Sequence, residues 1–290
     1  MQVRVATRGS ELARWQAGEV ARLIGASAPG VDVSLVVVET SGDRRLDVPI
    51  WEIGGQGVFV KEVQAAVLEE RADAAVHSAK DLPSGTVSGL AIGAFGLRGD
   101  PRDALVGSTL DGLPHGGRVA TGSIRRRAQL AHLRPDLVFE DLRGNIGTRL
   151  AKADGYDAIL MAVAALHRLG LEERITEALD PEVMVPQVGQ GAIAVECRSD
   201  DERTREQLAR VDHVATRRAV EAERAFLAVL GGGCNLPVGA YATVNGRVIS
   251  LNAVVAAEDG STCRTHRAEG TDPVEVGRAV AHHLLGVATS

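Results

Sequence analysis

The chain has 290 residues, a formal net charge of −6 and 45% hydrophobic residues, which is enough for two or three domains with their own cores. The negative charge and the few aromatic residues (2 Trp, 2 Tyr, 4 Phe) argue against nucleic acid as a main partner. No apolar stretch approaches the roughly 20 residues of a membrane span, and the N-terminal residues run directly into a strand pattern. We therefore expect a cytoplasmic protein. The cysteines Cys197, Cys234 and Cys263 form no CxxC pair, so neither a disulfide framework nor a zinc site is suggested.

The first third of the chain alternates between strand and helix patterns. Residues 3–6 indicate a short strand, and Ser10 is a candidate N-cap for the helix that follows the next turn. Such a strand–turn–helix junction leaves backbone N–H groups free at the carboxyl edge of a sheet, which suits anions. The apolar run 33–38 is typical of a strand buried on both faces.

Residues 47–59 fit neither a helical nor a strand period. They contain three glycines, one proline and several apolar residues. This composition suggests a mobile flap over a binding site, with an ordinary surface loop as the alternative. A helix pattern begins at about residue 60, and a strand pattern follows at 74–76.

Polar residues follow directly after the strand at 74–76. A buried strand that ends in Ser78, Lys80 and Asp81 places polar groups at the sheet edge where α/β proteins bind ligands. The neighbouring Lys80 and Asp81 are also compatible with a solvated ion pair. A hydrolase triad of His77, Ser78 and Asp81 is disfavoured, because neighbours on a strand point to alternate faces and no GxSxG elbow occurs.

The pattern of the first 95 residues recurs after a turn-rich segment at 98–103, which we interpret as a crossing between domains. A strand near 119–120 leads into a helix that opens with Ile124, Arg125 and Arg126. Cations at a helix N-terminus oppose the helix dipole, so this arrangement is unfavourable unless an anion lies among them. A basic surface turn is the alternative reading.

The rest of the chain also alternates between strand and helix patterns. Strands are expected at 137–139, 158–161 and 192–196, and Asn145 is a candidate cap of a helix flanked by Arg143 and Arg149. A second Gly/Pro junction at 185–191 suggests that a middle domain is inserted between two halves of the first. The last third predicts a helix at 213–230, a hairpin around 245–246 and a helix capped at 272–273.

We therefore predict two similar doubly wound α/β domains joined by a double crossover, as in periplasmic binding proteins. A small C-terminal α+β domain with a three-stranded antiparallel sheet completes the fold. The expected boundaries are 1–96 with 192–211 for the first domain, 97–191 for the central domain and 212–290 for the last.

Arginines lie at three of the strand-to-helix turns. The planar guanidinium matches a carboxylate or a phosphate with two parallel hydrogen bonds. The phosphate-binding patterns GxxxxGK[ST] and GxGxxG after a strand are absent, so a nucleotide is not expected. The sequence therefore predicts a small ligand with several carboxylates, bound between domains, and Asp81 could handle protons or a developing cation beside it.

Cys234 lies in the segment 230–237, at the junction between the helix pattern and a strand pattern. Three glycines before it leave the backbone free to bring the thiol close to another surface or to a bound molecule. The alternative is a helix C-cap followed by a buried, inert thiol, because free cysteines are often buried.

Six separated segments resemble the porphobilinogen deaminase family, also called hydroxymethylbilane synthase, in register from about residue 3 to 285. They are 6–10 (ATRGS), 75–83 (AVHSAKDLP), 121–126 (TGSIRR), 142–149 (LRGNIGTR), 188–192 (VGQGA) and 232–237 (GGCNLP). The resemblance implies a monomeric, cytoplasmic transferase of tetrapyrrole (haem) biosynthesis. It would join four porphobilinogen molecules head to tail into hydroxymethylbilane, with release of ammonia. A dipyrromethane primer would be bound to Cys234 through a thioether.

The same resemblance implies roles for individual residues. Asp81 would be the catalytic acid, and Phe59 would face the cleft from the flap 47–59. No metal is expected. Two departures stand out: Gln56 replaces a lysine that many members carry in the flap, and Gly122 replaces a frequent serine. The cofactor would be held by Cys234, Ser78, Lys80, Asp81, Thr121, Ser123, Arg125, Arg126, Arg143, Gly144 and Asp43, and the substrate by Arg8, Ser10, Gln16, Phe59, Arg149 and Arg168.

Two other functions remain open from the residues. Two α/β lobes also suit a non-enzymatic carboxylate-binding protein of the solute-binding type, which would need no Cys234. A cofactor-free relative kept for regulation is the other possibility. A covalent adduct on Cys234 distinguishes the enzyme from both.

Overall fold

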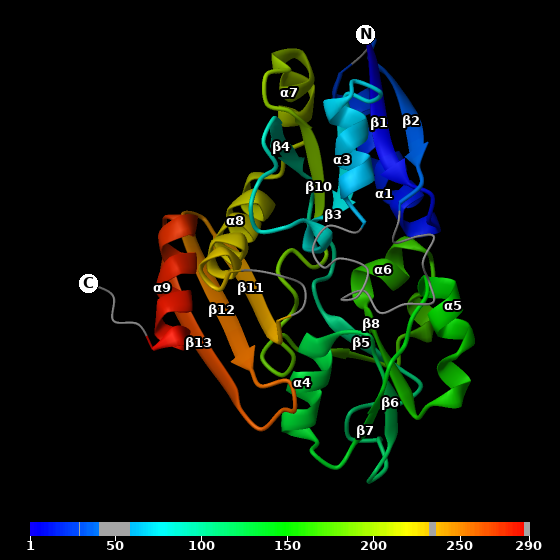
Figure 1. The fold of residues 1–290 in the computed structure, drawn as a ribbon, viewed down its shortest axis with the longest axis vertical. Coiled ribbons are helices and arrows are strands. Elements are labelled where there is room, and N and C mark those ends of the chain that lie inside the picture. The colour runs from blue at the N-terminus through cyan, green and yellow to red at the C-terminus, as the bar shows by residue number, and fades with distance from the viewer. Residues whose placement is uncertain (29, 41–58, 232–235, 287–290) are drawn as a thin grey trace. The chain divides into compact units, whose positions relative to one another are not determined.

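The computed structural model describes residues 1–28, 30–40, 59–231 and 236–286 (Figure 1). Its contacts divide the chain into two compact units, which are residues 1–98 with 192–217 and residues 99–191 with 218–290. The three-domain division expected above, with a separate domain at 212–290, stays a prediction.

The first unit is built on a five-stranded sheet. In this sheet β1 is parallel to β2 and β3, whereas β10 is antiparallel to both β3 and β4. The chain leaves the sheet after β4 and returns through β10, which confirms the predicted double crossover. The strand order is β2-β1-β3-β10-β4, formed by β1 (Gln2–Arg8), β2 (Asp32–Val38), β3 (Ala74–Ser78), β4 (Leu90–Phe95) and β10 (Ile193–Arg198).

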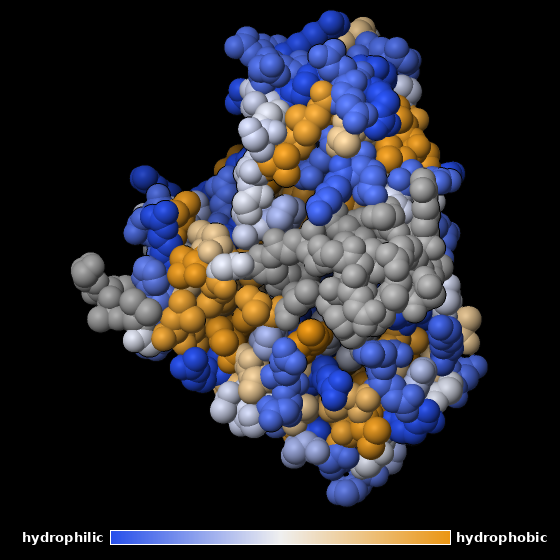
Figure 2. Space-filling model, viewed as in Figure 1, coloured by the Kyte–Doolittle hydropathy of each residue, from blue (hydrophilic) through white to orange (hydrophobic). Residues whose placement is uncertain are grey.

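Helices α1 (Glu11–Ser27) and α3 (Lys61–Leu68) pack on opposite faces of this sheet. Val5 belongs to the core that α1 covers, whereas its neighbour Ala6 belongs to the core that α3 covers. Successive side chains of a strand alternate between the two faces of the sheet, so β1 contributes side chains to both cores. Helix α7 (Glu202–Ala209) follows β10 in this unit, whereas α8 (Val214–Val229) begins in the first unit and continues in the second. Figure 2 shows polar residues over α7, in which half of the residues are charged.

The prediction that the apolar run 33–38 is buried on both faces is wrong. This strand, β2, lies at the end of the strand order, and the side chains of Leu35 and Val37 are 41% and 46% exposed. An apolar run reports β propensity and does not distinguish a central strand from an edge strand.

The second unit repeats the sheet of the first. Its strand β6 is parallel to β7 and β8, and β5 is antiparallel to β8 and β9. Position by position, the order β7-β6-β8-β5-β9 matches that of the first sheet, which confirms the predicted recurrence. Strands β5 and β9, like helix α7, were not predicted. The elements are β5 (Asp103–Val106), β6 (Arg118–Ala120), α4 (Ile124–Leu133), β7 (Val138–Glu140), α5 (Ile146–Ala151), β8 (Ala158–Ala162), α6 (Val163–Arg168) and β9 (Glu177–Leu179).

The C-terminal elements form the predicted antiparallel meander with a helix packed against it. Strands β11 (Val238–Asn245) and β12 (Val248–Ala256) meet at Gly246, whose φ of 57° is the left-handed conformation that a tight hairpin needs. Strand β13 (Cys263–Gly270) pairs with β12. Helix α9 (Pro273–Leu285) is capped by Asp272, which accepts hydrogen bonds from two backbone N–H groups of its first turn.

Among the described residues, no helix is both long and apolar enough to cross a bilayer.

Candidate active site

The first group of site residues lies at one edge of the first sheet. Strands β1 and β3 are parallel neighbours, so Arg8 and Ser78 end at the same edge. The Ser78 hydroxyl is hydrogen-bonded to Nε2 of Gln16 on α1 at 2.9 Å. The guanidinium of Arg8 lies 4.1 Å from the centre of the Phe59 ring, a cation–π contact. Four of the predicted residues are thus brought together in two contacting pairs.

A one-turn 3₁₀ helix (Ala79–Asp81) follows β3 and carries Lys80 and Asp81. Two backbone hydrogen bonds hold this turn: Ala79 donates to the carbonyl of Ala192 at 3.0 Å, and Leu82 donates to that of Ala79 at 3.2 Å. Asp81 is therefore presented at the end of a buried strand, on a turn anchored to the returning crossover.

His77 belongs to the other face of the sheet from Ser78. Its Nε2 lies 3.2 Å from Oε2 of Glu196 on β10, and Gln64 of α3 donates to the same oxygen at 2.8 Å. All three side chains are buried. His77 therefore contacts residues on the α3 side while Ser78 contacts α1, so the two residues do not form a catalytic dyad.

The second group of site residues lies at the start of α4. Ser123 caps this helix by accepting a hydrogen bond from the backbone N–H of Arg126, and Thr121 accepts one from the N–H of Ser123. Arg125 and Arg126 are buried, at 3% and 6% exposure. Two buried cations in the first turn of a helix require a counter-charge.

Asp103, the first residue of β5, supplies that counter-charge. Its Oδ1 lies 2.8 Å from Nε and 2.7 Å from Nη2 of Arg126, and its Oδ2 lies 2.7 Å from Nη1 of Arg125. The sequence predicted an anion among these arginines. The structure shows that one such anion comes from the chain itself, from a residue that we had interpreted as part of a turn.

Electrostatics keeps Asp103 ionised although it is fully buried. Burial opposes its charge, but the attraction of the two guanidinium groups and the hydrogen bonds from Arg125 and Gln190 hold its pKa below the usual range. Burial also lowers the pKa of Arg126, because removal from water disfavours the charged form.

Arg125 keeps unused donors despite its ion pair. Its Nη1 donates to the carbonyl of Val185 at 2.7 Å, but Nε and Nη2 have no hydrogen-bond partner among the described residues. Unpaired buried donors are costly, so they favour a ligand that brings acceptor oxygens. The prediction of an external anion at this position therefore retains support from the geometry.

Glycines allow close approach at the turns of the second unit. A Cβ on Gly122 would lie 2.8 Å from the carbonyl oxygen of Leu142, so a serine at this position would require a backbone shift. Gly144 has a φ of 113°, and a Cβ there would lie 2.6 Å from Cγ2 of Thr148. Arg149 donates from Nε to the carbonyl of Gly144 at 2.8 Å, at the start of the helix that Asn145 caps. Arg143 directly precedes Gly144 in this turn.

The motif 188–192 joins several elements of the second unit. Gly189 donates to Oε2 of Glu223 on α8 at 2.7 Å. Gln190 donates to the carbonyl of Pro101 at 2.7 Å and to Oδ1 of Asp103 at 2.9 Å. The motif therefore contacts the same carboxylate that pairs with the two arginines of α4.

Arg168, at the end of α6, donates from Nη2 to the carbonyl of Gly191 at 2.6 Å. Burial lowers the pKa of Arg168 to about 10, so the group remains charged at neutral pH. A half-buried guanidinium at this position suits an acidic ligand group.

Sequence reasoning missed three buried carboxylates, Asp103, Glu196 and Glu223, which are at most 2% exposed. Glu196 and Glu223 interrupt otherwise apolar faces of a strand and of a helix, and a buried acid in such a pattern is almost always paired. That signal was available in the sequence. The partners of these carboxylates were not, because they lie far away along the chain.

Three predicted positions, Asp43, Gln56 and Cys234, lie outside the described residues, as does most of the segment 47–59. Of the remaining predicted residues, Arg8, Gln16, Phe59, Ser78, Lys80 and Asp81 belong to the first group, and Thr121, Ser123, Arg125 and Arg126 belong to the second. Arg143, Gly144 and Arg149 lie at the start of α5, and Arg168 lies at the end of α6. Ser10 uses its side chain to cap α1.

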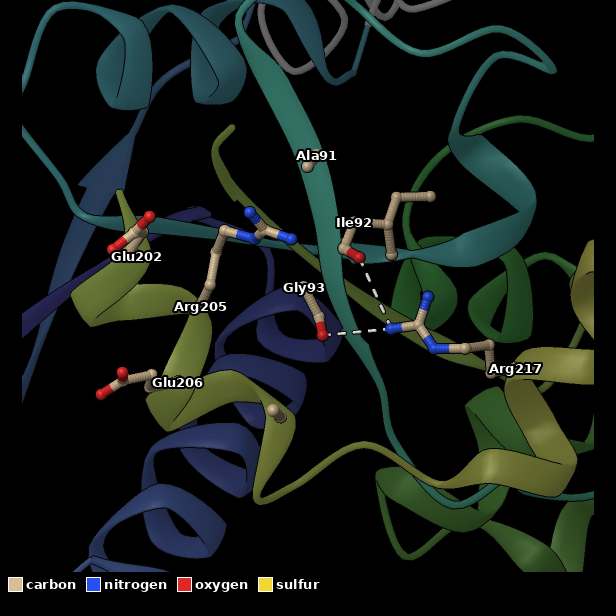
Figure 3. A pocket seen from close by; sticks show the side chains of 8 residues that line it. Ala91, Ile92, Gly93, Glu202, Arg205, Glu206 and Arg217 are labelled. Carbon is tan, nitrogen blue, oxygen red and sulfur yellow. Dashed lines mark hydrogen bonds between the residues drawn. The ribbon is translucent and has the colours of Figure 1, made fainter. Parts of the chain in front are cut away.

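A separate pocket of about 500 Å³ lies in the first unit, beside β4 and α7 (Figure 3). Arg217 borders it and donates from Nη2 to the carbonyls of Ile92 and Gly93, at 3.4 Å and 3.0 Å. None of the predicted site residues lines this pocket. Within the described part of the chain, no cluster of three or more His, Cys, Asp or Glu side chains could hold a metal ion.

Comparison with solved structures finds proteins of low sequence identity. The periplasmic domain of BvgS from B. pertussis aligns with a TM-score of 0.38 and 18% identity, over 72% of this chain and 39% of that chain. The methionine-binding protein MetQ aligns with a TM-score of 0.44 and 13% identity, over 72% and 89%. A TRAP periplasmic solute-binding protein from Shewanella oneidensis with bound succinate aligns with a TM-score of 0.39 and 11% identity, over 73% and 76%.

Family models account for nearly the whole chain. Residues 3–206 match "Porphobilinogen deaminase, dipyromethane cofactor binding domain", and residues 217–286 match "Porphobilinogen deaminase, C-terminal domain". These two matches span the edge that carries Asp81, the arginines of α4 and the segment that carries Cys234. The chain belongs to the porphobilinogen deaminase family.

Proposed function

We propose that Asp81 and the arginines at the two sheet edges carry out the family's reaction, hydroxymethylbilane synthesis. In this reaction four porphobilinogen molecules are deaminated and joined head to tail on a dipyrromethane primer. Arg125 gives the main support for this proposal, because its side chain is buried and two of its N–H donors have no partner among the described residues. A ligand carboxylate would accept hydrogen bonds from both donors.

The residues fit a group that bears several carboxylates. Ser123, Arg125 and Arg126 at the start of α4, with Arg143 and Gly144 at the neighbouring turn, would hold the acetate and propionate groups of the dipyrromethane. Bound there, the dipyrromethane supplies a pyrrole ring with a free α-carbon to which substrate is added. Asp43, Ser78, Lys80 and Thr121 are proposed to line the same group.

Cys234 is the proposed attachment point. A thiol reacts as thiolate, and burial raises the pKa of Cys197 to about 11 and also raises that of Cys263. Both thiols are therefore less ionised at neutral pH than an ordinary cysteine, which disfavours them as the attachment point. The glycines before Cys234 support its assignment, since they allow close approach to a bound group.

Asp81 is the proposed catalytic residue. Its carboxylate would accept hydrogen bonds from pyrrole N–H groups and stabilise the positive charge that develops as ammonia leaves. Ordered electrostatic groups of this kind commonly lower a barrier by about 3–4 kcal/mol. Arg8, Arg149 and Arg168 would pair with substrate carboxylates, while Ser10, Gln16 and Phe59 complete the substrate side. We expect the protein to act as a monomer in the cytoplasm, with porphobilinogen as its small-molecule substrate.

Intact-protein mass and turnover test this proposal. Protein made in a host that supplies porphobilinogen should carry the mass of two pyrrole rings, and Cys234→Ser should remove that mass. Asp81→Asn should keep the adduct but lower the rate of hydroxymethylbilane formation by about 10²- to 10⁴-fold. Asp111→Asn, on an exposed surface, is the matched control and should retain both.

Each result separates one part of the proposal. An unmodified mass with no turnover would leave a carboxylate-binding protein or a cofactor-free relative as the better description. Near-normal turnover of Asp81→Asn would remove that carboxylate from the catalytic role while leaving the primer attachment intact.

A further inference from the structure

Asp103 is a buried acid whose role the family reaction leaves unspecified. It is 0% exposed, and its two oxygens contact both arginines of α4. Gln190 donates to one of these oxygens at 2.9 Å, so the carboxylate is held from a second element as well. Its position is therefore fixed by three side chains.

The three charged groups leave a net charge of one. Two guanidinium groups contribute two positive charges, and the carboxylate of Asp103 cancels one of them. The orientation of Arg126 is also fixed, because its Nη1 donates to the carbonyl of Leu160 at 3.1 Å. Among these three groups, the donors that have no hydrogen-bond partner in the described part of the chain are Nε and Nη2 of Arg125.

A ligand at these donors must leave a balanced charge behind. In a site shielded from water, a monoanion neutralises the remaining positive charge, whereas a dianion leaves an excess negative charge next to Asp103. Nε and Nη2 of one guanidinium form the edge that accepts the two oxygens of one carboxylate in parallel.

We propose that Asp103 is a specificity-determining residue that makes the Arg125–Arg126 pair a site for one monoanionic carboxylate and excludes dianions such as phosphate. This inference rests on the proposed role of Arg125 as a carboxylate binder. Asp103 itself touches the two arginines and acts on the ligand through them.

Anion binding to a chain without the primer tests this idea independently of turnover. All variants carry Cys234→Ser, so that no covalent group competes for Arg125. Propionate and inorganic phosphate are titrated at constant ionic strength, at a pH where phosphate is mainly the dianion. Binding is followed by calorimetry and by the shift of the unfolding temperature.

The parent chain should bind propionate more tightly than phosphate. Asp103→Asn leaves two positive charges, so the ratio of the two dissociation constants should move toward phosphate by about tenfold or more. The double variant Asp103→Asn with Arg126→Gln restores a net charge of one and should restore the preference for propionate. Asp111→Asn, an exposed control, should leave the preference of the parent unchanged.

Three outcomes would overturn the proposal: a parent chain that prefers phosphate, an Asp103→Asn chain with the parent's preference, or an Arg125→Gln chain that binds propionate as the parent does. If Asp103→Asn does not fold, the charge-restored double variant decides, because a preference for phosphate there contradicts the charge argument.

The adduct on Cys234 is measured separately in the otherwise unmodified chain. If the adduct is missing while the anion preferences follow the charge count, the proposed function fails and the role of Asp103 stands. If the adduct is present and the preferences do not follow the charge count, only the role of Asp103 fails.

Discussion

At the scale of single residues, Gly191 shows why one position in the motif 188–192 must be glycine. Its φ is +84°, and a Cβ there would lie 2.5 Å from the carbonyl oxygen of Gly99. Gly191→Ala should lower the free energy of unfolding by about 2–4 kcal/mol, because backbone strain and a clash with a neighbouring backbone add. Urea unfolding followed by circular dichroism measures the loss.

Gly170→Ala is the matched control for this residue. Gly170 has a φ of +65°, but a Cβ there would have no atom within 4 Å. This substitution should lower the free energy of unfolding only by the backbone strain, about 1–2 kcal/mol. If both variants lose the same free energy of unfolding, the close contact with the Gly99 carbonyl does not restrict the residue type at position 191.

At the scale of elements, Glu223 connects α8 to two other segments. Its Oε2 accepts from the N–H of Gly189 at 2.7 Å and its Oε1 from the N–H of Ala242 on β11 at 2.9 Å, with no exposure to solvent. Glu223→Ala should lower the free energy of unfolding by about 2–5 kcal/mol, since two buried donors lose their acceptor. Glu223→Gln should cost less, because one amide oxygen remains to accept.

Thermal and urea unfolding test this order. The control is Glu206→Gln on α7, an exposed glutamate, which should change stability by no more than about 0.5 kcal/mol. If Glu223→Ala were as stable as this control, the described hydrogen bonds would not hold β11 and the motif 188–192 to α8.

At the scale of the whole molecule, the shifted pKa values predict sensitivity to acid. Burial, with the charge of the neighbouring His283, lowers the pKa of His266 from 6.5, and the two rings stack at 3.6 Å. His266 therefore binds a proton more readily in the unfolded chain than in the folded one. Neutral His266 contributes to folding stability above pH 6.5, and this stability is lost as the pH falls below that value. The unfolding free energy should decline in this range, and His266→Gln should reduce the slope.

A second decline should follow at lower pH. Asp73, Asp100 and Asp103 have pKa values below the ordinary 3.8, since the hydrogen bonds and charges of nearby arginines outweigh the effect of burial. Their contribution is present above pH 3.8 and is lost as the pH falls below that value. Unfolding free energies measured across both ranges test the prediction, and stability that stayed constant from neutral pH to pH 3 would contradict both statements.

Much of the architecture could be predicted from local patterns. Ser10, Asn145 and Asp272 were identified as helix caps because a cap depends on residues three positions apart at most. The hairpin at Gly246 follows for the same reason. Short strands such as β5 and β9 escaped prediction, because four or three residues carry too little periodicity to distinguish them from a turn.

The sequence by itself determined the crossed α/β architecture, the positions of the arginines and the motifs that place the chain in its family. Only the tertiary structure decided how the charges are paired. Asp103 precedes Arg125 by 22 positions and reads as part of a turn, yet strand β5 brings it to the start of α4. Pairing of buried charges is set by strand order, which joins residues that no local pattern connects.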